Sequence, residues 1–306
     1  MKFFRGDVRS LKPLYFLLLL SISSATESSG DSKRFIEAAV KSNLTEIKEL
    51  LQSGVEVDVR DNEGATALIR ATQQGALESV KFLIGRGADV NAVERLNGAS
   101  ALMFAVRKAE NEEGKRTAPI EAKVDVGRAL IRAGANVNQK NHWGGTALQW
   151  ACDSGNLVMV RELITAAADV RAGDSNGLTP LMVAANYEGE VYLQIVRVLL
   201  SAKAEINATD RAGETALMKA SLNHFKTDTI KLLMDSGADV NVRTRDGFTA
   251  LMLACRSARV DVIDFLIDHG ADAYAKTNEG LSVFQVAKQS GYKDAIQALI
   301  RKGITK

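Results

Sequence analysis

Polar turns that contain glycine alternate along most of the chain with short segments rich in Ala, Leu, Ile, Val and Met. A Thr or Ser such as Thr66 precedes the first apolar segment of each unit, and its hydroxyl can accept a backbone N–H of a helix's first turn. Pro180 stands where a first helical position is expected and a missing N–H is harmless. Glycines such as Gly87 and Gly237 follow the second apolar segments, where helices often end in a left-handed residue. Proline is scarce, so the pattern predicts a largely helical chain.

Two sequence signatures repeat along the chain. The first reads Gly, any residue, Thr or Ser, any residue and a Leu-type residue, at 64–68, 98–102, 144–148, 177–181, 213–217, 247–251 and 280–284. Its hydroxyl residues are 34, 46, 33, 36, 34 and 33 positions apart. The second signature, Gly-Ala-Asp/Asn-Val-Asn, occupies 87–91, 134–138 and 237–241, and its first half recurs at 270–272. Such a period indicates a repeat array, in which each unit buries its apolar surface against its neighbours.

With both signatures at this period, the chain from about residue 33 to 306 resembles the ankyrin-repeat family. The resemblance implies an all-α fold, a solenoid of stacked helix-turn-helix units with β-turn fingers. We expect an N-terminal cap at 33–60 and a C-terminal capping repeat at 277–306, since a solenoid needs polar outer faces at both ends. The six central repeats are expected at 61–93, 94–140, 141–173, 174–209, 210–243 and 244–276.

One column departs from the family's pattern, which often has His three residues after the capping Thr. Here that column reads Ile69, Met103, Gln149, Met182, Met218, Met252 and Gln285. We therefore expect the His-centred hydrogen bonds that link fingers in many ankyrins to be absent. Core packing is the simplest interpretation of the four Met residues, and a soft-metal or adaptable binding strip is the alternative.

A second departure concerns the glycine that ends the second helix. Ala167 and Lys203 replace it in units three and four. A Cβ atom in a left-handed conformation costs about 1 kcal/mol. We therefore expect the joints at these two residues to be weaker or differently shaped.

The second repeat is about 13 residues longer than the 33-residue norm, and the excess is the charged segment 110–122. Its charge, Gly114 and Pro119 predict a solvated loop between the two helices, opposite the fingers. A tolerated insertion is the simpler interpretation, because lengthening a loop adds little entropic cost. A secondary contact site is the alternative.

Residues 1–25 have the layout of a secretory signal peptide, with a basic start, an apolar run from Leu14, and small residues that include Ser23 and Ala25. We expect cleavage after Ala25, a flexible segment at 26–32, and a periplasmic or secreted protein. The alternative is a retained membrane anchor. The apolar stretch 14–22 has nine residues, whereas a spanning helix needs about 20.

The charge is concentrated in this leader. Lys2, Arg5, Arg9 and Lys12 against Asp7 give it +3, so the rest of the chain carries 2 − 3 = −1. A near-neutral body lacks the basic footprint that binding to a phosphate backbone needs. We therefore expect no nucleic-acid partner, and no membrane partner after cleavage of the leader.

The sequence contains no motif typical of a catalytic or metal-binding site. His142, His224 and His269 lie in different repeats without metal-ligand spacing, and no phosphate-binding loop or nucleophile elbow occurs. We predict no catalytic residue, no metal and no cofactor. Cys152 and Cys255 share one column three repeats apart. With helices stacked about 8–10 Å apart, a disulfide is out of reach, and two buried free thiols are expected.

Ankyrins bind partners with their fingertips and the inner face of the first helices, so the resemblance implies a protein-binding site at the matching positions. These are Arg107, Lys108, His142, Trp143, Leu178, Asn186, Tyr187, Arg211, Arg245, Phe248 and Arg256. Exposed aromatic and Arg side chains are the usual anchors of interfaces. For Trp143, covering a neighbouring finger is as reasonable as partner contact. We expect Trp150 to be a buried structural residue.

The sequence thus predicts a non-catalytic, monomeric scaffold that binds another protein, of unknown identity, through its finger surface. Two alternatives remain open. The chain could be a secreted effector that binds a host protein, or a structural element that self-associates. Fractionation separates the first alternative from a periplasmic scaffold, and a size measurement tests the second.

Overall fold

The computed structural model describes residues 30–107, 120–222 and 227–305, and this part of the chain contains sixteen helices and no β-strand. The expected signal peptide, Lys108, His224 and most of the loop at 110–122 lie outside the described residues. The first helix begins at Gly30, so the last three residues of the segment expected to be flexible are helical. The helix after the long loop begins at Ile120, within the range expected to be loop.

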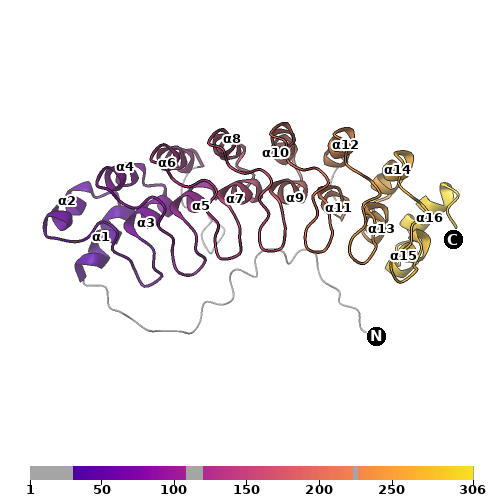
Figure 1. Cartoon of the computed structure of the whole chain (residues 1–306), viewed down its shortest axis with the longest axis horizontal. Coiled ribbons are helices and arrows are strands. Elements are labelled where there is room, and N and C mark those ends of the chain that lie inside the picture. The colour runs from indigo at the N-terminus through magenta and orange to yellow at the C-terminus, as the bar shows by residue number, and fades with distance from the viewer. Residues whose placement is uncertain (1–29, 108–119, 223–226, 306) are drawn as a thin grey trace.

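The sixteen helices form eight antiparallel pairs, each with an inner and an outer helix (Figure 1). The inner helices are α1 (Gly30–Val40), α3 (Ala67–Gln74), α5 (Ala101–Val106), α7 (Ala147–Asp153), α9 (Pro180–Ala185), α11 (Ala216–Leu222), α13 (Ala250–Arg256) and α15 (Val283–Ser290). The outer helices are α2 (Leu44–Gln52), α4 (Leu77–Gly85), α6 (Ile120–Arg132), α8 (Leu157–Thr165), α10 (Glu190–Ser201), α12 (Asp228–Asp235), α14 (Val260–Asp268) and α16 (Lys293–Arg301).

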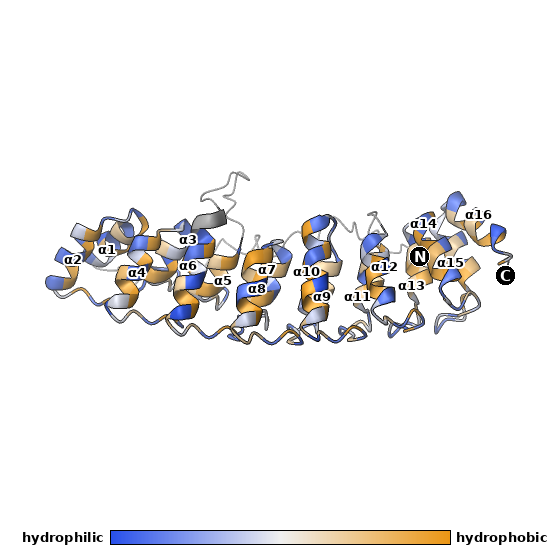
Figure 2. Cartoon of the chain, turned by 90° about the horizontal axis from the view of Figure 1, so that it is seen from above, coloured by the Kyte–Doolittle hydropathy of each residue, from blue (hydrophilic) through white to orange (hydrophobic). Residues whose placement is uncertain are grey.

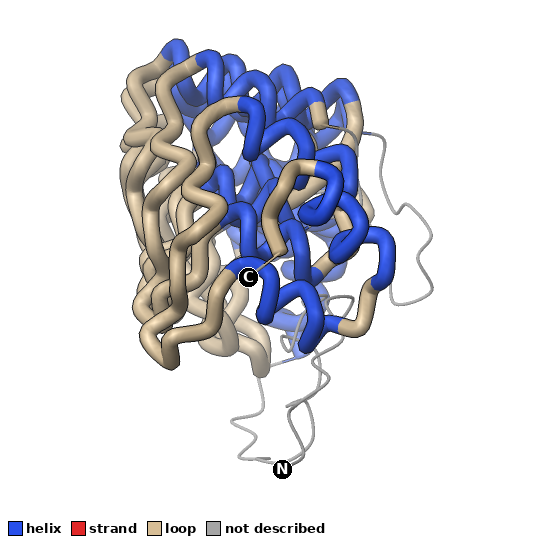
Figure 3. Tube along the Cα trace, turned by 90° about the vertical axis from the view of Figure 1, so that its right-hand side faces the viewer, coloured by secondary structure: helices blue, strands red, loops and turns tan. Residues whose placement is uncertain are grey.

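The pairs stack side by side into a gently curved, elongated solenoid (Figure 1). Seen from above, successive helices lie roughly parallel, and their connecting loops run along one edge (Figure 2). An end-on view shows these loops gathered on one side of the two helical layers (Figure 3). The predicted all-α solenoid of helix-turn-helix units is therefore confirmed.

The capping residues begin the inner helices as the sequence predicted. Thr66, Thr179 and Thr249 each accept a hydrogen bond from the backbone N–H three residues ahead. Ser100 is an exception, since its side chain makes no such bond. The hydroxyl caps hold the turn from finger to helix in a similar geometry in most repeats.

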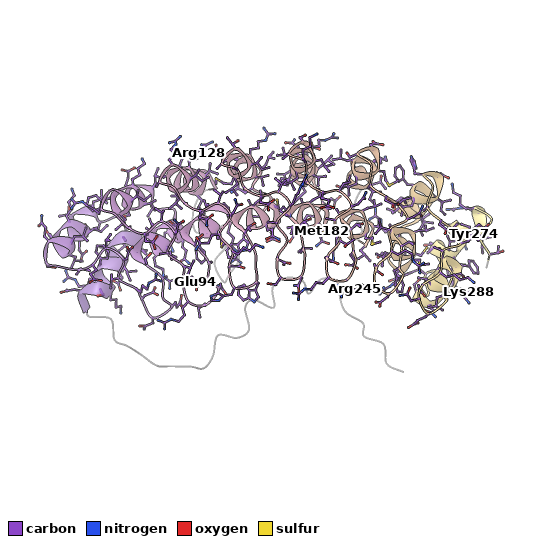
Figure 4. The ribbon with its side chains drawn as sticks, viewed as in Figure 1. Glu94, Arg128, Met182, Arg245, Tyr274 and Lys288 are labelled. Atoms are coloured by element: carbon purple, nitrogen blue, oxygen red, sulfur yellow. The ribbon has the colours of Figure 1, made fainter. Side chains whose placement is uncertain are left out.

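The column of small residues lies at the centre of the stack. The Ala residues five positions after the caps are buried, which lets the two helical layers approach closely. Met103, Met182, Met218 and Met252 are at most 1% exposed, so they pack in the core rather than form a surface strip. Figure 4 labels Met182 beside the inner helices, where the fingers join them. Both cysteines are buried and free, as expected.

The fingers are joined at their tips by an unbroken row of backbone hydrogen bonds, which we call the tip ladder. In each step, an amide of one fingertip donates to a carbonyl of the preceding fingertip. The bonds run from Arg95 to Glu63, His142 to Asn97, Ser175 to Trp143, Arg211 to Asn176, Arg245 to Ala212 and Asn278 to Asp246, at 2.7–2.9 Å. Only main-chain atoms take part, so the ladder does not depend on which side chains the tips carry.

A second row, the root ladder, joins the loops that follow the outer helices. Here a side-chain oxygen of one unit accepts the amide of an Asp or Asn in the next unit. The rungs join Asp58 to Asp89, Asn91 to Asn136, Asn138 to Asp169, Asn207 to Asp239 and Asn241 to Asp272, at 2.7–3.1 Å. Within the described repeats, one step lacks a rung. There Arg171 replaces the Asn, and its Nε donates to the carbonyl of Lys203 at 3.2 Å.

The two non-glycine residues expected in a left-handed conformation do adopt it, with φ of 65° at Ala167 and 66° at Lys203. They flank the step of the root ladder that has no rung. Ser42 and Ala258 are also left-handed, with φ of 57° and 54°, which the sequence analysis did not anticipate.

One residue of the column in which many ankyrins have His still links two repeats through its side chain. Gln149 accepts the Thr146 amide at 2.9 Å, and its Nε2 donates to the carbonyl of Leu178 in the next repeat. An amide side chain thus supplies one link of the kind that His provides elsewhere.

Candidate functional site

Each finger turns around one polar side chain near its start. In the fifth unit, the carboxylate of Asp210 accepts the amides of Ala212 and Glu214, at 2.8 and 2.9 Å. Asp61, Asn141 and Asp174 make the same pair of bonds in their fingers. These turns satisfy the main chain locally, and the tip ladder then fixes each finger against the next. The fingertip side chains are therefore displayed from a rigid frame.

The second finger is one residue longer and is built on Glu94 instead. Its carboxylate is buried, and it accepts the amides of Leu96, Asn97 and Ala99 at 2.6–3.1 Å. The longer Glu side chain reaches around the additional residue, which an Asp could not. The result is a fingertip that exposes Leu96, an apolar side chain that is 49% exposed.

Four of the predicted contact residues lie at fingertips. His142 and Trp143 occupy the third finger, Arg211 the fifth and Arg245 the sixth, and all four are exposed. Trp143 is 36% exposed, a large value for an indole. Figure 4 places Arg245 on the finger side of the solenoid, together with Glu94 of the second finger. The structure therefore brings these four residues onto one row.

Four more predicted residues lie just behind the tips or at the ends of inner helices. Leu178 and Phe248 follow the finger glycines and are half-buried. Asn186 and Tyr187 follow α9 and are half-buried as well. We call the fingertips, together with the solvent-facing side of the inner helices, the inner surface.

Tyr187 is held in place by its neighbours. Its hydroxyl donates to the carboxylate of Asp153 at 2.5 Å, and its ring stacks on Tyr192 with centroids 4.8 Å apart. The hydroxyl of Tyr192 donates to the carbonyl of Asp153 at 3.1 Å. Burial, and then the bond to Asp153, raise the pKa of the Tyr187 phenol. Tyr187 therefore presents a fixed ring edge rather than a free hydroxyl.

Arg107 and Arg256 are exposed at the ends of inner helices, and each lies over an aromatic ring. The guanidinium of Arg107 is 5.7 Å from the ring centre of Trp150, which meets Phe104 edge-on with centroids 6.0 Å apart. The guanidinium of Arg256 is 5.3 Å from the ring centre of Phe248. Trp150 packs against the hydrophobic core as a structural residue, but it is only half-buried, so the full burial that the sequence predicted is not observed.

Sequence reasoning missed Phe104 and Trp150 although a positional signal was available. Both stand four residues after the capping residue of their repeat, the position of an inner helix that faces the inner surface. This column reads Arg70, Phe104, Trp150, Val183, Lys219, Leu253 and Val286. Its large or charged members are half-buried, and its small apolar members are buried.

The two charged members of this column are neutralised by their own fingers. Arg70 bonds Asp61 at 2.6 Å and Glu63 at 2.5 Å. Lys219 pairs with Asp210 at 2.8 Å and with Glu214. Burial is the largest single cause and would lower the pKa of Lys219 and raise that of Asp210. The hydrogen bonds and charge attraction within the finger together outweigh it, so the pKa of Lys219 is raised and that of Asp210 lowered. These clusters support the fingers and leave no net positive charge for a ligand.

The described residues hold no group of three or more His, Cys, Asp or Glu side chains that could bind a metal ion. Burial raises the pKa of both thiols, that of Cys255 to about 12, so neither is a nucleophile at neutral pH. Across the described ranges, no helix has the length and apolar character needed to cross a membrane.

Comparison with known proteins identifies the repeat. A family model for ankyrin repeats in three copies matches residues 35–114, 120–210, 191–277 and 217–306. The matches together cover nearly all of the region in which the sequence showed its period.

Several curated proteins are similar over part of their length. The mouse B-cell lymphoma 3 protein homolog is 38% identical over 130 residues, which are 42% of this chain and 26% of that protein. An ankyrin repeat-containing protein of Treponema pallidum is 34% identical over 147 residues, 48% of this chain and 45% of that protein. The ankyrin repeat protein YahD of Escherichia coli is 27% identical over 152 residues, 49% of this chain and 68% of that protein. The chain spans about a quarter of the length of the mouse relative.

Proposed function

The chain belongs to the ankyrin-repeat family, and from that premise we propose that it is a scaffold of the periplasm or the extracellular space that binds one client protein through its inner surface. Ankyrin repeats generally mediate protein–protein interactions and are typically non-catalytic. The proposal assigns the contact to the predicted residues on the fingertips and inner-helix ends, and it requires no cofactor.

One observation carries the proposal: the tip ladder fixes the fingers through the main chain and leaves the tip side chains exposed. A partner that meets His142, Trp143, Arg211 and Arg245 therefore meets side chains on an ordered frame. Preorganisation of this kind reduces the entropy lost on binding. Exposed Trp and Arg side chains are also the residue types that contribute most to protein interfaces.

The location is proposed from the leader alone. Its basic start, apolar run and small residues before the expected cleavage at Ala25 support export. Detection of the chain in the periplasmic or extracellular fraction, with its N-terminus at Thr26, is the expected result. A cytoplasmic chain that retains Met1 would contradict it. Fractionation also separates a periplasmic scaffold from a factor released to act on a host.

The binding site is tested by Trp143→Ala, with Val158→Ala as the matched control. Val158 is an apolar residue of the same repeat, 45% exposed on the outer helix α8. We expect Trp143→Ala to reduce recovery of the partner from an envelope extract by about tenfold or more, as loss of an interface anchor does. The tip rung through the Trp143 carbonyl uses the main chain and is retained, so the melting temperature should change little.

Val158→Ala should retain full recovery of the partner. Equal recovery with wild type and Trp143→Ala would remove Trp143 from the site. Equal losses with both variants would mean that the loss reflects a general disturbance of the third repeat and not a contact made by Trp143. A chain that is monomeric by light scattering at micromolar concentration is expected, whereas a stable oligomer would favour self-association.

A further inference from the structure

We propose that the inner surface recognises an acidic protein segment that carries two apolar side chains, one for each of the two arginine–aromatic pairs. This inference rests on the proposed function and specifies the chemistry of the partner. The pairs are Arg107 on Trp150 and Arg256 on Phe248.

The two pairs share the position of the arginine but not that of the ring. Each arginine stands seven residues after the capping residue of its repeat, Ser100 or Thr249, directly after α5 or as the last residue of α13. Trp150 belongs to the inner helix of the next repeat, whereas Phe248 lies in the finger of the same repeat as Arg256. Both rings are half-buried and both guanidinium groups are exposed. A guanidinium over a ring still has N–H groups at its edge, and these match the two oxygens of a carboxylate. Each pair thus offers an apolar ring beside a cation that is held in place.

The positive charge of the inner surface is not balanced locally. Arg95, Arg107, Arg211, Arg245 and Arg256 are exposed, and none of them forms an ion pair with a carboxylate of the described residues. Lys288, over the ring of Phe284 at 4.8 Å, extends the set to the last inner helix. Figure 4 shows Arg245 and Lys288 on the finger side and Arg128 on the opposite, outer layer.

The acidic groups of the same surface are fewer, and most of them are engaged. Asp210 and Glu214 pair with Lys219, and Asp153 accepts the hydroxyl of Tyr187. Asp246 and Glu279 are the exposed acids of the last two fingertips. Over the fingers and inner helices of the repeats (60–75, 93–107, 139–156, 173–189, 208–222, 243–259 and 276–291), thirteen Lys and Arg side chains against ten Asp and Glu side chains leave an excess of three positive charges, although the chain outside the leader has a net charge of −1. The excess is therefore a property of this surface, and an acidic partner complements it.

The separation of the two pairs sets the length of the segment. Trp150 belongs to the third central repeat and Phe248 to the sixth. With helices stacked about 8–10 Å apart, three steps cover about 30 Å, which an extended chain of about nine residues spans at roughly 3.3 Å per residue. The cluster of Lys219 with Asp210 and Glu214, which carries one net negative charge, lies between them, so acidic residues are expected near both apolar side chains rather than midway.

A protein segment fits this arrangement better than a nucleic acid does. Two of the exposed cations lie beside apolar rings, and the cluster of Lys219 with Asp210 and Glu214, which carries one net negative charge, interrupts the row between them. A phosphate backbone is best matched by a continuous basic track. Nucleic-acid binding is nevertheless an outcome that the experiment must be able to detect.

The test uses the full chain after removal of the leader and an array of ten-residue peptides. Two positions eight residues apart are varied among apolar residues, and the positions between them are drawn from Asp, Glu, Asn and Gln. We expect the bound peptides to be enriched in Asp and Glu beside the two apolar positions. No enrichment, or equal binding of the amide peptides, overturns the proposal.

The best acidic peptide is then titrated by fluorescence anisotropy against three variants. We expect Arg107→Gln and Arg256→Gln each to weaken binding about 3- to 10-fold, and their combination more. Arg86→Gln is the matched control, because Arg86 lies over Phe82 at 4.8 Å but caps the outer helix α4. Equal effects from all three variants would contradict the proposal. Binding of a 20-nucleotide single-stranded DNA as tightly as the peptide, with the same arginine dependence, would assign the surface to phosphate instead.

Failure of this proposal is distinguishable from failure of the proposed function. If Trp143→Ala abolishes capture of the partner while Arg107→Gln and Arg256→Gln retain it, the inner surface binds a protein of other chemistry. If Trp143→Ala and both arginine variants all retain capture, the partner binds elsewhere.

Discussion

The two ladders of this solenoid stack the same repeats by different means. At the tips, main-chain amides donate to main-chain carbonyls through every step between the fingers. At the roots, the acceptor is a side chain, and the step with Arg171 in place of Asn has no rung. A ladder of main-chain bonds tolerates any side chain, whereas a ladder of side-chain acceptors is broken by one substitution. The fingertips can therefore vary for binding without loss of stacking, and the roots cannot.

The finger glycines and the root glycines differ in the space that surrounds them. A Cβ atom at Gly213, in a finger, would lie 2.8 Å from the Arg245 amide of the next finger. A Cβ atom at Gly237, in a root loop, would meet nothing within 4 Å. Replacement of a root glycine thus costs only backbone strain, and the chain has made that replacement at Ala167 and Lys203. All seven fingers keep their glycine.

The largest effect is expected from Gly213→Ala. The new Cβ would push Arg245 away and disturb a tip rung, in addition to the strain at φ +81°. We expect a loss of about 2–4 kcal/mol in the free energy of unfolding, the sum of left-handed strain and overpacking. Urea denaturation measures it.

Gly280→Ala is the control for this prediction. Gly280 has the same φ of +81°, but it lies in the last finger and has nothing within 4 Å of the added atom. The strain alone should cost about 1 kcal/mol there. Equal losses at both glycines would mean that the packing of one finger on the next adds nothing.

A smaller effect, of opposite sign, is expected from Lys203→Gly. Lys203 is exposed and left-handed, so its replacement by glycine removes strain without loss of packing. Relief of the strain raises the free energy of unfolding, whereas the greater flexibility of glycine in the unfolded chain cancels part of this gain. We expect a net rise of about 0.5–1 kcal/mol. Lys203→Ala keeps the Cβ and should leave stability unchanged. An equal gain from both variants would show that the strain lies elsewhere.

The sequence predicted those features that depend on local chemistry. The period, the hydroxyl caps and the left-handed Ala167 and Lys203 follow from residue types at fixed positions of one repeat, and the structure bears them out. Ala258 could have been found in the same way, since it takes the position of the turn glycines Gly75 and Gly155.

The inner surface was harder to predict because its properties arise between repeats. Trp150 was expected to be buried, but its ring is covered only in part, by Phe104 and Arg107 of the preceding repeat. The hydroxyl of Tyr187 is engaged by Asp153, again one repeat earlier. Such pairs form only when two columns of neighbouring units are superposed. The contact role of the predicted residues stays a prediction.

A gain of similar size is expected from restoration of the missing root rung by Arg171→Asn. In the intact steps, Asn138 and Asn241 accept an amide and also donate from Nδ2 to the carbonyl of the next left-handed residue. An Asn at position 171 could therefore replace the present bond to Lys203 and add an acceptor for the Glu205 amide. One net hydrogen bond of this kind adds about 0.5–1 kcal/mol.

The alkylation rates of the two thiols can show which interface between repeats is stabilised, because each thiol lies at a different interface. Cys152 is fully buried, and the adjacent Asp153 accepts hydrogen bonds from Tyr187 and Tyr192 of the fourth repeat. The main-chain carbonyl of Cys255 accepts a hydrogen bond from Ser290 of the last repeat. A buried thiol reacts with an alkylating reagent only when the interface that covers it opens.

Arg171→Asn should slow the labelling of Cys152 by about 2- to 5-fold and leave Cys255 unchanged. Arg171→Ala, which removes the arginine and adds no acceptor, should not slow either thiol. Equal slowing of both thiols by Arg171→Asn would mean that the repeats open together, and the difference between the two ladders would then have no local consequence.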